Sequence, residues 1–574
     1  MKLFTNPNFL AILFLIILTI PAVKSLAIPG FYSSHDGIDN HTVRIAQYTK
    51  AIIDGQFPPR HANSLYKGLG SPIFVYIYPV PYVFGAVLHL LDLSYVNSFK
   101  VIMALGFFFS GLLFYLWTKE IFKSEKAAFT GAIFYTWIPY RFSLIYVRGS
   151  LSELIAYTFL PLLLFTITKF FTGKNVKWLP AIALSFSLVL LSQNLVALIA
   201  IPIIGAYILI LSFLNKSFKN FFLSLCSLFW GFLISSFTYL PSLFERQYVR
   251  FDETFRNTYL DHLVTIKQLI RSPWDYGFDL KGTVSDQMSF QIGLAHLLIV
   301  FLSTLLIIYS LFLKREKPRR ESLEIIFPLF FLLVFVILVL LMIQTNLTLV
   351  IWHNLKILQI IDLPWRLLGI VALSTAFLAA FVAKKLKPGL LFLLLVSAVL
   401  TANRNHLRIN QTIIKDDSYF ETYTGTATQY NEFTPIWRQS TREPVGFSLN
   451  TKAEISSGEG NINDAFSKSN HLKFDVAITS PRAQLTINKF YFPKTQVTVD
   501  GKNLSQQEII ITNTTNTRLD IERDTSGLVA LNLEKGNHTV EFRYKETPLR
   551  VFANFLSLIS LLLALGFIVK NVKK

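Results

Sequence analysis

The chain has 574 residues, of which 52% are hydrophobic, and it carries a formal net charge of +19. Its repeated apolar runs are long enough to cross a bilayer, which excludes an ordinary soluble protein. The basic residues stand in short loops beside these runs, so the charge indicates orientation in a lipid bilayer and no nucleic-acid partner is expected. The single cysteine, Cys226, excludes an intramolecular disulfide and a cysteine-based metal site.

The apolar runs predict about twelve membrane spans. They are expected at 9–24, 97–118, 126–142, 153–172, 177–193, 195–213, 219–243, 291–313, 324–344, 366–383, 388–404 and 549–570. The first run could also be a cleaved secretory signal, but the polytopic body favours an anchor that is retained.

Six groups of basic residues test this list of spans. They are Lys119, Lys123 and Lys126; Lys169, Lys174 and Lys177; Lys216 and Lys219; Lys314, Arg315, Lys317, Arg319 and Arg320; Lys384, Lys385 and Lys387; and Lys570, Lys573 and Lys574. With twelve spans all six groups lie on one face, together with the N-terminus and the C-terminus. The positive-inside rule makes that face the cytoplasm, as expected for a multi-pass protein of the plasma membrane.

The segment 71–93 is apolar enough for a further span but is predicted not to cross. A crossing would reverse the direction of every later segment and place all six basic groups outside. The segment also contains Pro72, Pro79 and Pro81, which interrupt helical hydrogen bonding. We therefore expect it to lie in the outer interface or to form a re-entrant piece packed on the bundle.

Three regions are expected outside the membrane. Two are loops within a transmembrane domain at 1–404, namely a long loop at 25–96 and a second loop at 245–290. The third, 405–548, shows apolar residues at every second position, as in "HLKFDVAIT", which indicates antiparallel strands. It is predicted to be an extracytoplasmic β-sandwich that serves as a spacer or binds a glycan or acceptor. The final span and cytoplasmic tail follow at 549–574.

Ionisable residues are rare within the expected spans and gather instead at their outer ends. The run 388–402 contains none, which argues against an ion-coupled transporter. Near the outer mouth the sequence has His35, Asp36, His41 and several arginines. A carboxylate beside a hydroxyl acceptor can act as a general base, and arginines bind phosphate through paired hydrogen bonds. One acid with several arginines fits transfer from a lipid-linked phosphate.

Several motifs resemble those of one family. "HDGIDNHTVRIAQYTKAIIDGQFPPRH", "GLGSPIFVYIYPVPY", "YVRGSLSELIAYTFLPL" and "DLPWRLLGI" are similar to stretches of bacterial multi-span proteins whose domain is often labelled 6-pyruvoyl-tetrahydropterin synthase-related. Pterin synthases are soluble enzymes with a histidine-based zinc site, and nothing in this sequence supplies that constellation. The architecture instead resembles the GT-C superfamily of membrane glycosyltransferases. That resemblance implies a polytopic helical fold, a polyprenyl-phosphate sugar as donor and a catalytic acid in the first outer loop.

The resemblance also implies roles for single residues. Asp36 matches the acid of the "HDG" motif and is the expected catalytic residue. The expected substrate-binding residues are His35, His41, Arg44, Arg60, Arg148, Glu153, Trp365 and Arg366. Some members of the superfamily need a divalent metal, so Mg or Mn is an open cofactor, but no metal site is assigned. Where the family tends to have "SHN", this chain has Gln193 in "SQN", so no role is given to that position.

Each of these residues has a plainer structural interpretation as well. Asp36 could cap a helix, Arg148 and Glu153 could form a structural ion pair, and Arg366 could reach lipid headgroups. The favoured function is transfer of a sugar from polyprenyl phosphate to an extracytoplasmic glycan, lipid or protein. The alternatives are a lipid-linked glycan transporter or flippase, and a non-catalytic glycan-binding membrane protein. Burial of Asp36 in an ion pair, with no cavity beside it, would favour the last.

Overall fold

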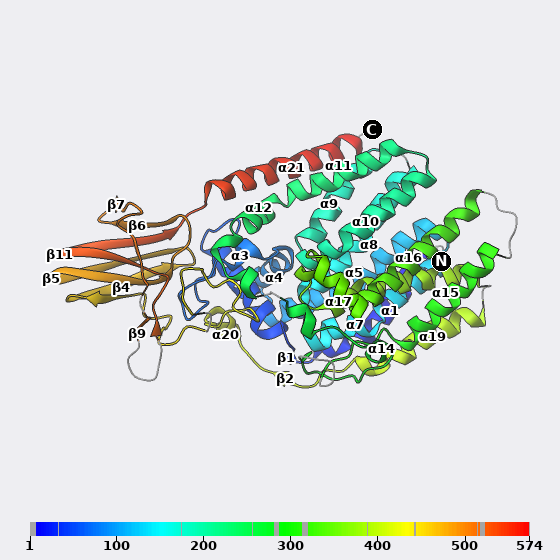
Figure 1. Cartoon of the computed structure of the whole chain (residues 1–574), viewed down its shortest axis with the longest axis horizontal. Coiled ribbons are helices and arrows are strands. Elements are labelled where there is room, and N and C mark those ends of the chain that lie inside the picture. Colours follow the sequence, from blue (N-terminus) through cyan, green and yellow to red (C-terminus); the bar gives the residue numbers. More distant parts are fainter. Residues whose placement is uncertain are drawn as a thin grey trace.

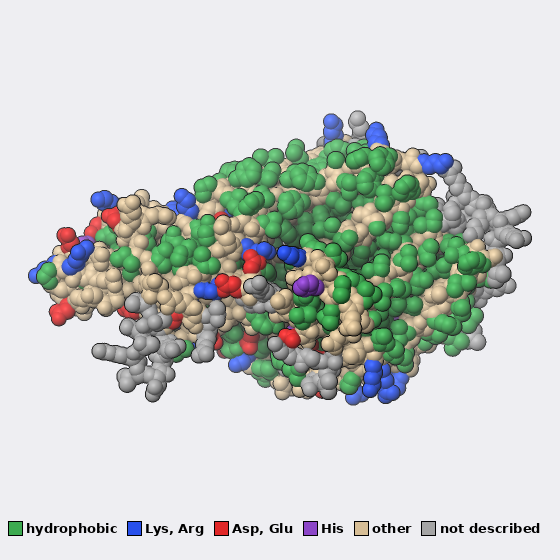
Figure 2. Space-filling model, viewed as in Figure 1, with side chains coloured by type: hydrophobic (Ala, Val, Ile, Leu, Met, Phe, Trp, Pro, Cys, Tyr) green, Lys and Arg blue, Asp and Glu red, His purple; other side chains and the backbone are tan. Residues whose placement is uncertain are grey.

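The apolar runs form a body of packed helices, and the alternating C-terminal residues form a sheet domain at one end of it (Figure 1). The computed structural model describes residues 7–32, 34–173, 175–254, 257–280, 286–312, 319–386, 389–440, 443–513, 515–516 and 523–572. Ser33 and the basic residues Lys174, Lys314, Arg315, Lys317, Lys387, Lys573 and Lys574 lie outside the described residues. Hydrophobic side chains cover most of the visible face of the helical body, whereas the sheet domain shows fewer of them and several charged side chains at its far end (Figure 2).

Eight helices of the described chain are long and apolar enough to cross a membrane. They are α1 (Pro7–Val23), α5 (Tyr95–Phe122), α8 (Leu151–Gly173), α10 (Asn194–Leu214), α15 (Leu294–Phe312), α16 (Arg319–Met342), α18 (Leu368–Lys385) and α21 (Pro548–Val572). A ninth span is obtained if α11 (Phe218–Ile234) and α12 (Ser236–Phe244), which are bent by 76° at their junction, are counted as one.

Length and composition thus identify eight or nine spans in the described residues, while each of the twelve predicted runs contains a helix. Three predicted spans form only α6 (Glu125–Thr136), α9 (Trp178–Leu190) and α19 (Leu390–Asn403), of 12, 13 and 14 residues. At 1.5 Å per residue these helices are about 18–21 Å long, short of the roughly 30 Å of hydrocarbon. α6 ends early because Pro139 follows it. A proline disfavours helical backbone at the residue before it, and Ile138 is accordingly extended, with ψ 145°.

The segment 71–93 contains no helix long enough to cross, as predicted. It forms the single turn α3 (Ile73–Tyr76) and the 11-residue helix α4 (Val80–Leu90). One face of α4 packs on α2 (Val43–Ile53) and on α5, while Phe84, Val87 and Leu90 on its other face are exposed. This apolar outer face fits a helix that lies along a bilayer surface.

The C-terminal sheet domain is confirmed, and its strands form one seven-stranded antiparallel sheet where a sandwich of two sheets was predicted. Its long strands β5 (His471–Phe490) and β11 (Leu528–Tyr544) pair along most of their length. The shorter strands are β3 (Ala453–Ser457), β4 (Gly460–Lys468), β6 (Thr495–Val499), β7 (Lys502–Asn503) and β8 (Ile510–Ile511). The alternation seen in the sequence buries Leu472, Phe474 and Val476 in an apolar core separate from that of the helices.

The chain between the last bundle helix and the sheet folds back over the first outer loop. We call residues 407–438 the covering segment. In it, β2 (Thr412–Ile413) pairs with β1 (Phe31–Tyr32), and the short helix α20 (Asp417–Glu421) packs on α2. The strands of the sheet begin only at β3, so the predicted domain 405–548 contains this covering segment as well as the sheet.

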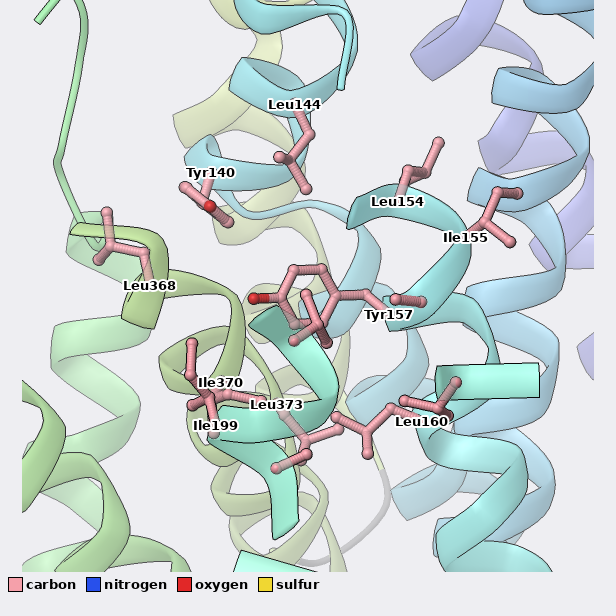
Figure 3. Close-up of a cluster of buried hydrophobic side chains, with 14 of the residues drawn as sticks. Tyr140, Leu144, Leu154, Ile155, Tyr157, Leu160, Ile199, Leu368, Ile370 and Leu373 are labelled. Carbon is pink, nitrogen blue, oxygen red and sulfur yellow. The ribbon is translucent and has the colours of Figure 1, made fainter. Parts of the chain in front are cut away.

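The helical core continues directly beneath the outer loops. Tyr140, Tyr157 and aliphatic residues of α8 and α18 form one buried apolar cluster there (Figure 3). The two helices approach closely at Gly369, where an added Cβ would lie 2.0 Å from the Tyr157 hydroxyl oxygen. This hydroxyl donates to the Arg366 carbonyl oxygen at 3.2 Å, which ties α8 to the turn that precedes α18.

Candidate functional site

Two irregular turns cross each other above this core and bring Asp36 to Arg148. Each turn is π-helical, over Gly37–Thr42 and Ser143–Arg148, a conformation that is frequent at functional sites. The Asp36 amide donates to the Arg148 carbonyl oxygen at 2.8 Å. Gly149 has φ +62°, and a Cβ there would lie 2.9 Å from the Gly37 Cα. The glycines of "HDG" and "RGS" therefore permit the close crossing that positions both charged side chains.

Five side chains form a line of alternating charge, which we call the charge chain: Asp36, Arg148, Glu153, Arg366 and Asp362. Arg148 Nη2 lies 3.9 Å from Asp36 Oδ2 and 2.7 Å from Glu153 Oε1. Arg366 Nε lies 3.2 Å from the same Glu153 oxygen, and its Nη1 lies 2.8 Å from Asp362 Oδ1. The side chains of Arg148 and Glu153 are only 3% and 1% exposed, so each depends on its partners to offset the lost hydration.

The carboxylate of Asp36 is held mainly by amide side chains. Its Oδ1 accepts hydrogen bonds from Gln429 Nε2 at 2.7 Å and from Asn40 Nδ2 at 3.3 Å. It makes no capping hydrogen bond to the turn that follows, although its position in the sequence is that of a cap. The side chain is 13% exposed, which leaves a small solvent-facing area. Two cavities of about 260 and 360 Å³ lie beside the sheet domain, and Asp36 lines neither of them.

Trp365 connects the charge chain to the second outer loop. The Arg148 guanidinium lies over the Trp365 ring, 4.7 Å from its centroid, and Trp365 Nε1 donates to Asp279 Oδ2 at 2.8 Å. His262 Nδ1 lies 2.8 Å from the same carboxylate oxygen. Burial opposes the charged form of His262, but Asp279 outweighs it and raises the pKa of His262 above its ordinary value.

The sequence prediction missed Asp279, His262, Asp362 and Gln429. The loop at 245–290 was expected outside the membrane, but its sequence has no periodic pattern that would single out His262 and Asp279 as site residues. Asp362 stands two residues before Pro364 of the "PWR" motif and was the one missed residue with a nearby signal. His35 does lie at this end of the site, where its ring stacks on Phe278 at 4.2 Å between centroids.

The other expected binding residues hold different parts of the structure together. His41 Nδ1 and Arg44 Nη1 both contact the Tyr82 hydroxyl, at 3.1 and 3.2 Å. Arg44 also donates twice to the Ala427 carbonyl oxygen of the covering segment. Arg60 pairs with Glu546 at 3.3 Å, beside the 260 Å³ cavity. The structure thus brings together Asp36, Arg148, Glu153, Trp365 and Arg366, and it gives His41, Arg44 and Arg60 other partners.

The donor atoms do not fit a pre-formed metal site. Within the described ranges, no group of three or more His, Cys, Asp or Glu side chains is arranged to hold an ion. His35 and His41 contact Phe278 and Tyr82 respectively and do not converge on Asp36.

Comparison with known proteins gives one family match. The family described as "6-pyruvoyl-tetrahydropterin synthase related domain; membrane protein" matches residues 74–409, more than half of the chain. The matched range includes Arg148, Glu153 and Arg366, and it begins after Asp36. No protein with a curated description matches the chain. Among solved structures, the arabinofuranosyltransferase AftD from mycobacteria is similar over 69% of this chain and 26% of its own length, with 11% identity and a TM-score of 0.41.

Proposed function

Because the chain belongs to the 6-pyruvoyl-tetrahydropterin synthase related family of membrane proteins, we propose that it works at a bilayer, as a glycosyltransferase. The donor in this proposal is a polyprenyl-phosphate sugar, and the acceptor is an extracytoplasmic glycan, lipid or protein. The sheet domain lies outside the plasma membrane and both termini lie in the cytoplasm. The observation that carries the proposal is the convergence of one partly exposed acid, Asp36, with Arg148 and Arg366 at the end of an apolar-coated helical body.

Asp36 is the general base in this scheme. The acceptor hydroxyl oxygen forms the new bond to the anomeric carbon while its proton passes to the Asp36 carboxylate. The bond between that carbon and the phosphate oxygen breaks, and the phosphate leaves with the electron pair. The two amides on Asp36 Oδ1 are neutral donors, so they orient the carboxylate without neutralising it.

Arg366 is better placed than Arg148 to meet the leaving phosphate. Its side chain is 15% exposed, and its Nε makes no aligned hydrogen bond even though Glu153 is near. Arg148 is almost fully buried and serves to position Asp36 and Glu153. Glu153 accepts from Tyr140 and its charge is matched by two guanidinium groups, so in this scheme it is a positioning residue and not the base. A preorganised guanidinium that faces developing negative charge lowers the barrier to transfer.

One observation favours a second candidate, a non-catalytic glycan-binding membrane protein. Asp36 is mostly buried, it lies 3.9 Å from Arg148, and neither described cavity reaches it. A purely structural ion pair would have the same features. The two candidates differ in whether the charge of Asp36 is needed for turnover.

The test compares Asp36→Asn with Asp39→Asn. Asparagine keeps the size of the side chain and its contact with Gln429 but removes the base, so sugar transfer from a polyprenyl-phosphate donor should fall by about 10²–10⁴-fold. Asp39 accepts a hydrogen bond from the Tyr419 hydroxyl at 2.8 Å and lies outside the charge chain, so its variant is the matched control and should keep most activity. Equal amounts of folded protein in membranes are needed. Unchanged transfer by Asp36→Asn would reject the proposed base.

A further inference from the structure

A polar cavity lies where the first outer loop and the end of the sheet domain meet the start of α21. Its volume is about 260 Å³, and its lining includes Phe57, Arg60, Lys545, Glu546 and Arg550. None of the residues that line it belongs to the charge chain. The cavity is therefore separate from the candidate site around Asp36.

This cavity stands at the level where lipid headgroups meet the protein. α21 leaves the sheet domain and runs along the helical body (Figure 1), and it is apolar enough to span a membrane from Pro548 to Lys570. Its 25 residues extend over about 37 Å, whereas the hydrocarbon of a bilayer is roughly 30 Å thick. The first turn of α21, which carries Arg550, therefore lies at the edge of the hydrocarbon, beside the phosphates of the leaflet that faces the sheet domain.

The lining of the cavity has a net positive charge. Three cationic side chains, those of Arg60, Lys545 and Arg550, are accompanied by one carboxylate, that of Glu546. Glu245 pairs with Arg550 from outside the lining. Three cations thus remain against two carboxylates, and the cavity attracts anions.

The other residues of the lining add no charge. The His61 ring stacks on Tyr544, with 3.8 Å between their centroids. Burial and the nearby Lys489 lower the pKa of His61 to about 3, so its ring is neutral. The positive charge of the cavity is therefore not offset by any further group in its wall.

Two of the three cations keep a donor for a ligand. Lys545 is exposed, and within the described residues its ammonium group makes no ion pair and no hydrogen bond. Arg550 contacts Glu245 through Nε and Nη2, at 2.8 and 2.7 Å. Its Nη1 has no hydrogen bond in the described part of the chain and is not among the enclosed atoms, so it stays accessible. Ammonium and guanidinium groups are the side chains that bind phosphate best.

Arg60 supplies fixed charge instead of a free donor. Its Nε donates to Glu546 Oε1, its Nη1 to the Phe237 carbonyl oxygen and its Nη2 to Asn554 Oδ1. These contacts hold the wall of the cavity in place before a ligand arrives, which reduces the entropic cost of binding.

Apolar side chains beside the cavity favour a lipid over a soluble anion. Phe57 in the lining is 92% exposed, and an aromatic side chain of this kind suits insertion among lipid headgroups. Val551, Phe552 and Phe555 are exposed on the next turns of α21. They lead from the cavity into the hydrocarbon, where acyl chains attached to a bound headgroup would pack against them.

We propose that this cavity binds the headgroup of an anionic phospholipid, with the phosphate held by Lys545 and Arg550. A lipid in this position contacts the first outer loop, the sheet domain and α21 together. A zwitterionic lipid carries the same phosphate but also a cation, which the positive lining repels. The site does not depend on whether the chain transfers sugar.

The test measures lipid binding to the full chain by native mass spectrometry. The protein in detergent is titrated with phosphatidylglycerol, or with phosphatidylcholine of the same acyl chains, and the spectra give the dissociation constant of the first bound lipid. Phosphatidylglycerol should bind at least about five-fold more tightly. Lys545→Met keeps the length of the side chain and removes its charge, so it should reduce this preference about five-fold.

Glu546→Gln makes the opposite change in charge and should have the opposite effect. It removes the carboxylate of the lining, so the affinity for phosphatidylglycerol should rise. Opposite shifts from two adjacent residues do not arise from a general loss of folding. Lys545 is exposed, so Lys545→Met provides the test even if Glu546→Gln does not fold.

Matched controls come from β11, outside the lining of the cavity. Lys535→Met and Glu541→Gln make the same chemical changes there and should leave the preference unchanged. Equal dissociation constants for the two lipids in wild type would overturn the proposal, and so would equal effects of Lys545→Met and Lys535→Met. Displacement of phosphatidylglycerol by an equal concentration of inorganic phosphate would also overturn it, because the ligand would then be a soluble anion.

Discussion

Two arginines seven residues apart, Arg141 and Arg148, are both buried but are stabilised in opposite ways. Arg148 meets carboxylates on two sides. Arg141 lies over the rings of Tyr135 and Tyr157, 4.3 and 5.2 Å from their centroids, and its Nε and Nη1 have no hydrogen-bond partner. The apolar core therefore holds this cation by aromatic contact and by one hydrogen bond, from Nη2 to the Tyr157 carbonyl oxygen at 3.4 Å. The carboxylates beside Arg148 belong to the charge chain, which the proposed transfer would use.

The contrast between Arg141 and Arg148 predicts the largest loss of stability for a substitution at Glu153. Glu153→Gln leaves Arg148 and Arg366 buried without the charge between them, so we expect a loss of about 3–5 kcal/mol in the free energy of unfolding. Arg141→Met keeps the volume and removes a cation that has no carboxylate partner in the described structure, so it should cost less than about 1.5 kcal/mol. Thermal unfolding of the purified protein in one detergent measures both. Similar losses in the two variants would mean that the arginines are held alike.

A second prediction concerns the crossing of the two turns. Gly149→Ala has to adopt φ +62° and brings a Cβ to 2.9 Å from the Gly37 Cα, so a loss of about 1–3 kcal/mol is expected, together with reduced transfer. Gly205 in α10 has open space around it, and Gly205→Ala should instead stabilise the helix by about 0.5–1 kcal/mol. Denaturation midpoints of Gly149→Ala and Gly205→Ala, each compared with wild type, measure these two changes in stability. If both alanines are neutral, the close crossing does not constrain the site.

The smallest expected effect is a pH dependence that comes from His262. Its pKa is raised in the folded state, so its pairing with Asp279 stabilises the protein fully below the unfolded pKa of about 6.5 and this contribution is lost as pH rises through the folded value. His262→Gln should remove this part of the loss of stability that accompanies rising pH. Melting temperatures of wild type and variant, measured at several pH values on both sides of neutrality, should converge as the solution becomes more basic. Parallel curves would contradict the raised pKa.

Much of the fold could be predicted because apolar runs and two-residue alternation are local signals. Even so, Pro139 divided one predicted span into α6 and a short turn, which hydropathy alone does not reveal. The site was predicted in part, through motifs that contain Asp36, Arg148 and Arg366. Its remaining contacts are tertiary: Gln429 binds Asp36 from 393 residues away, and Asp279 binds Trp365 from another loop. No local pattern encodes such pairs.

The hydrogen bond from Gln429 to Asp36 joins residues 393 positions apart, and this has a consequence for biogenesis. Asp36 leaves the ribosome early, whereas Gln429 is synthesised only after seven of the eight long helices. Closing so long a loop is slow, so the carboxylate meets its strongest donor late in assembly. Chains that stop before the covering segment would insert most of their helices and still have an unfinished site.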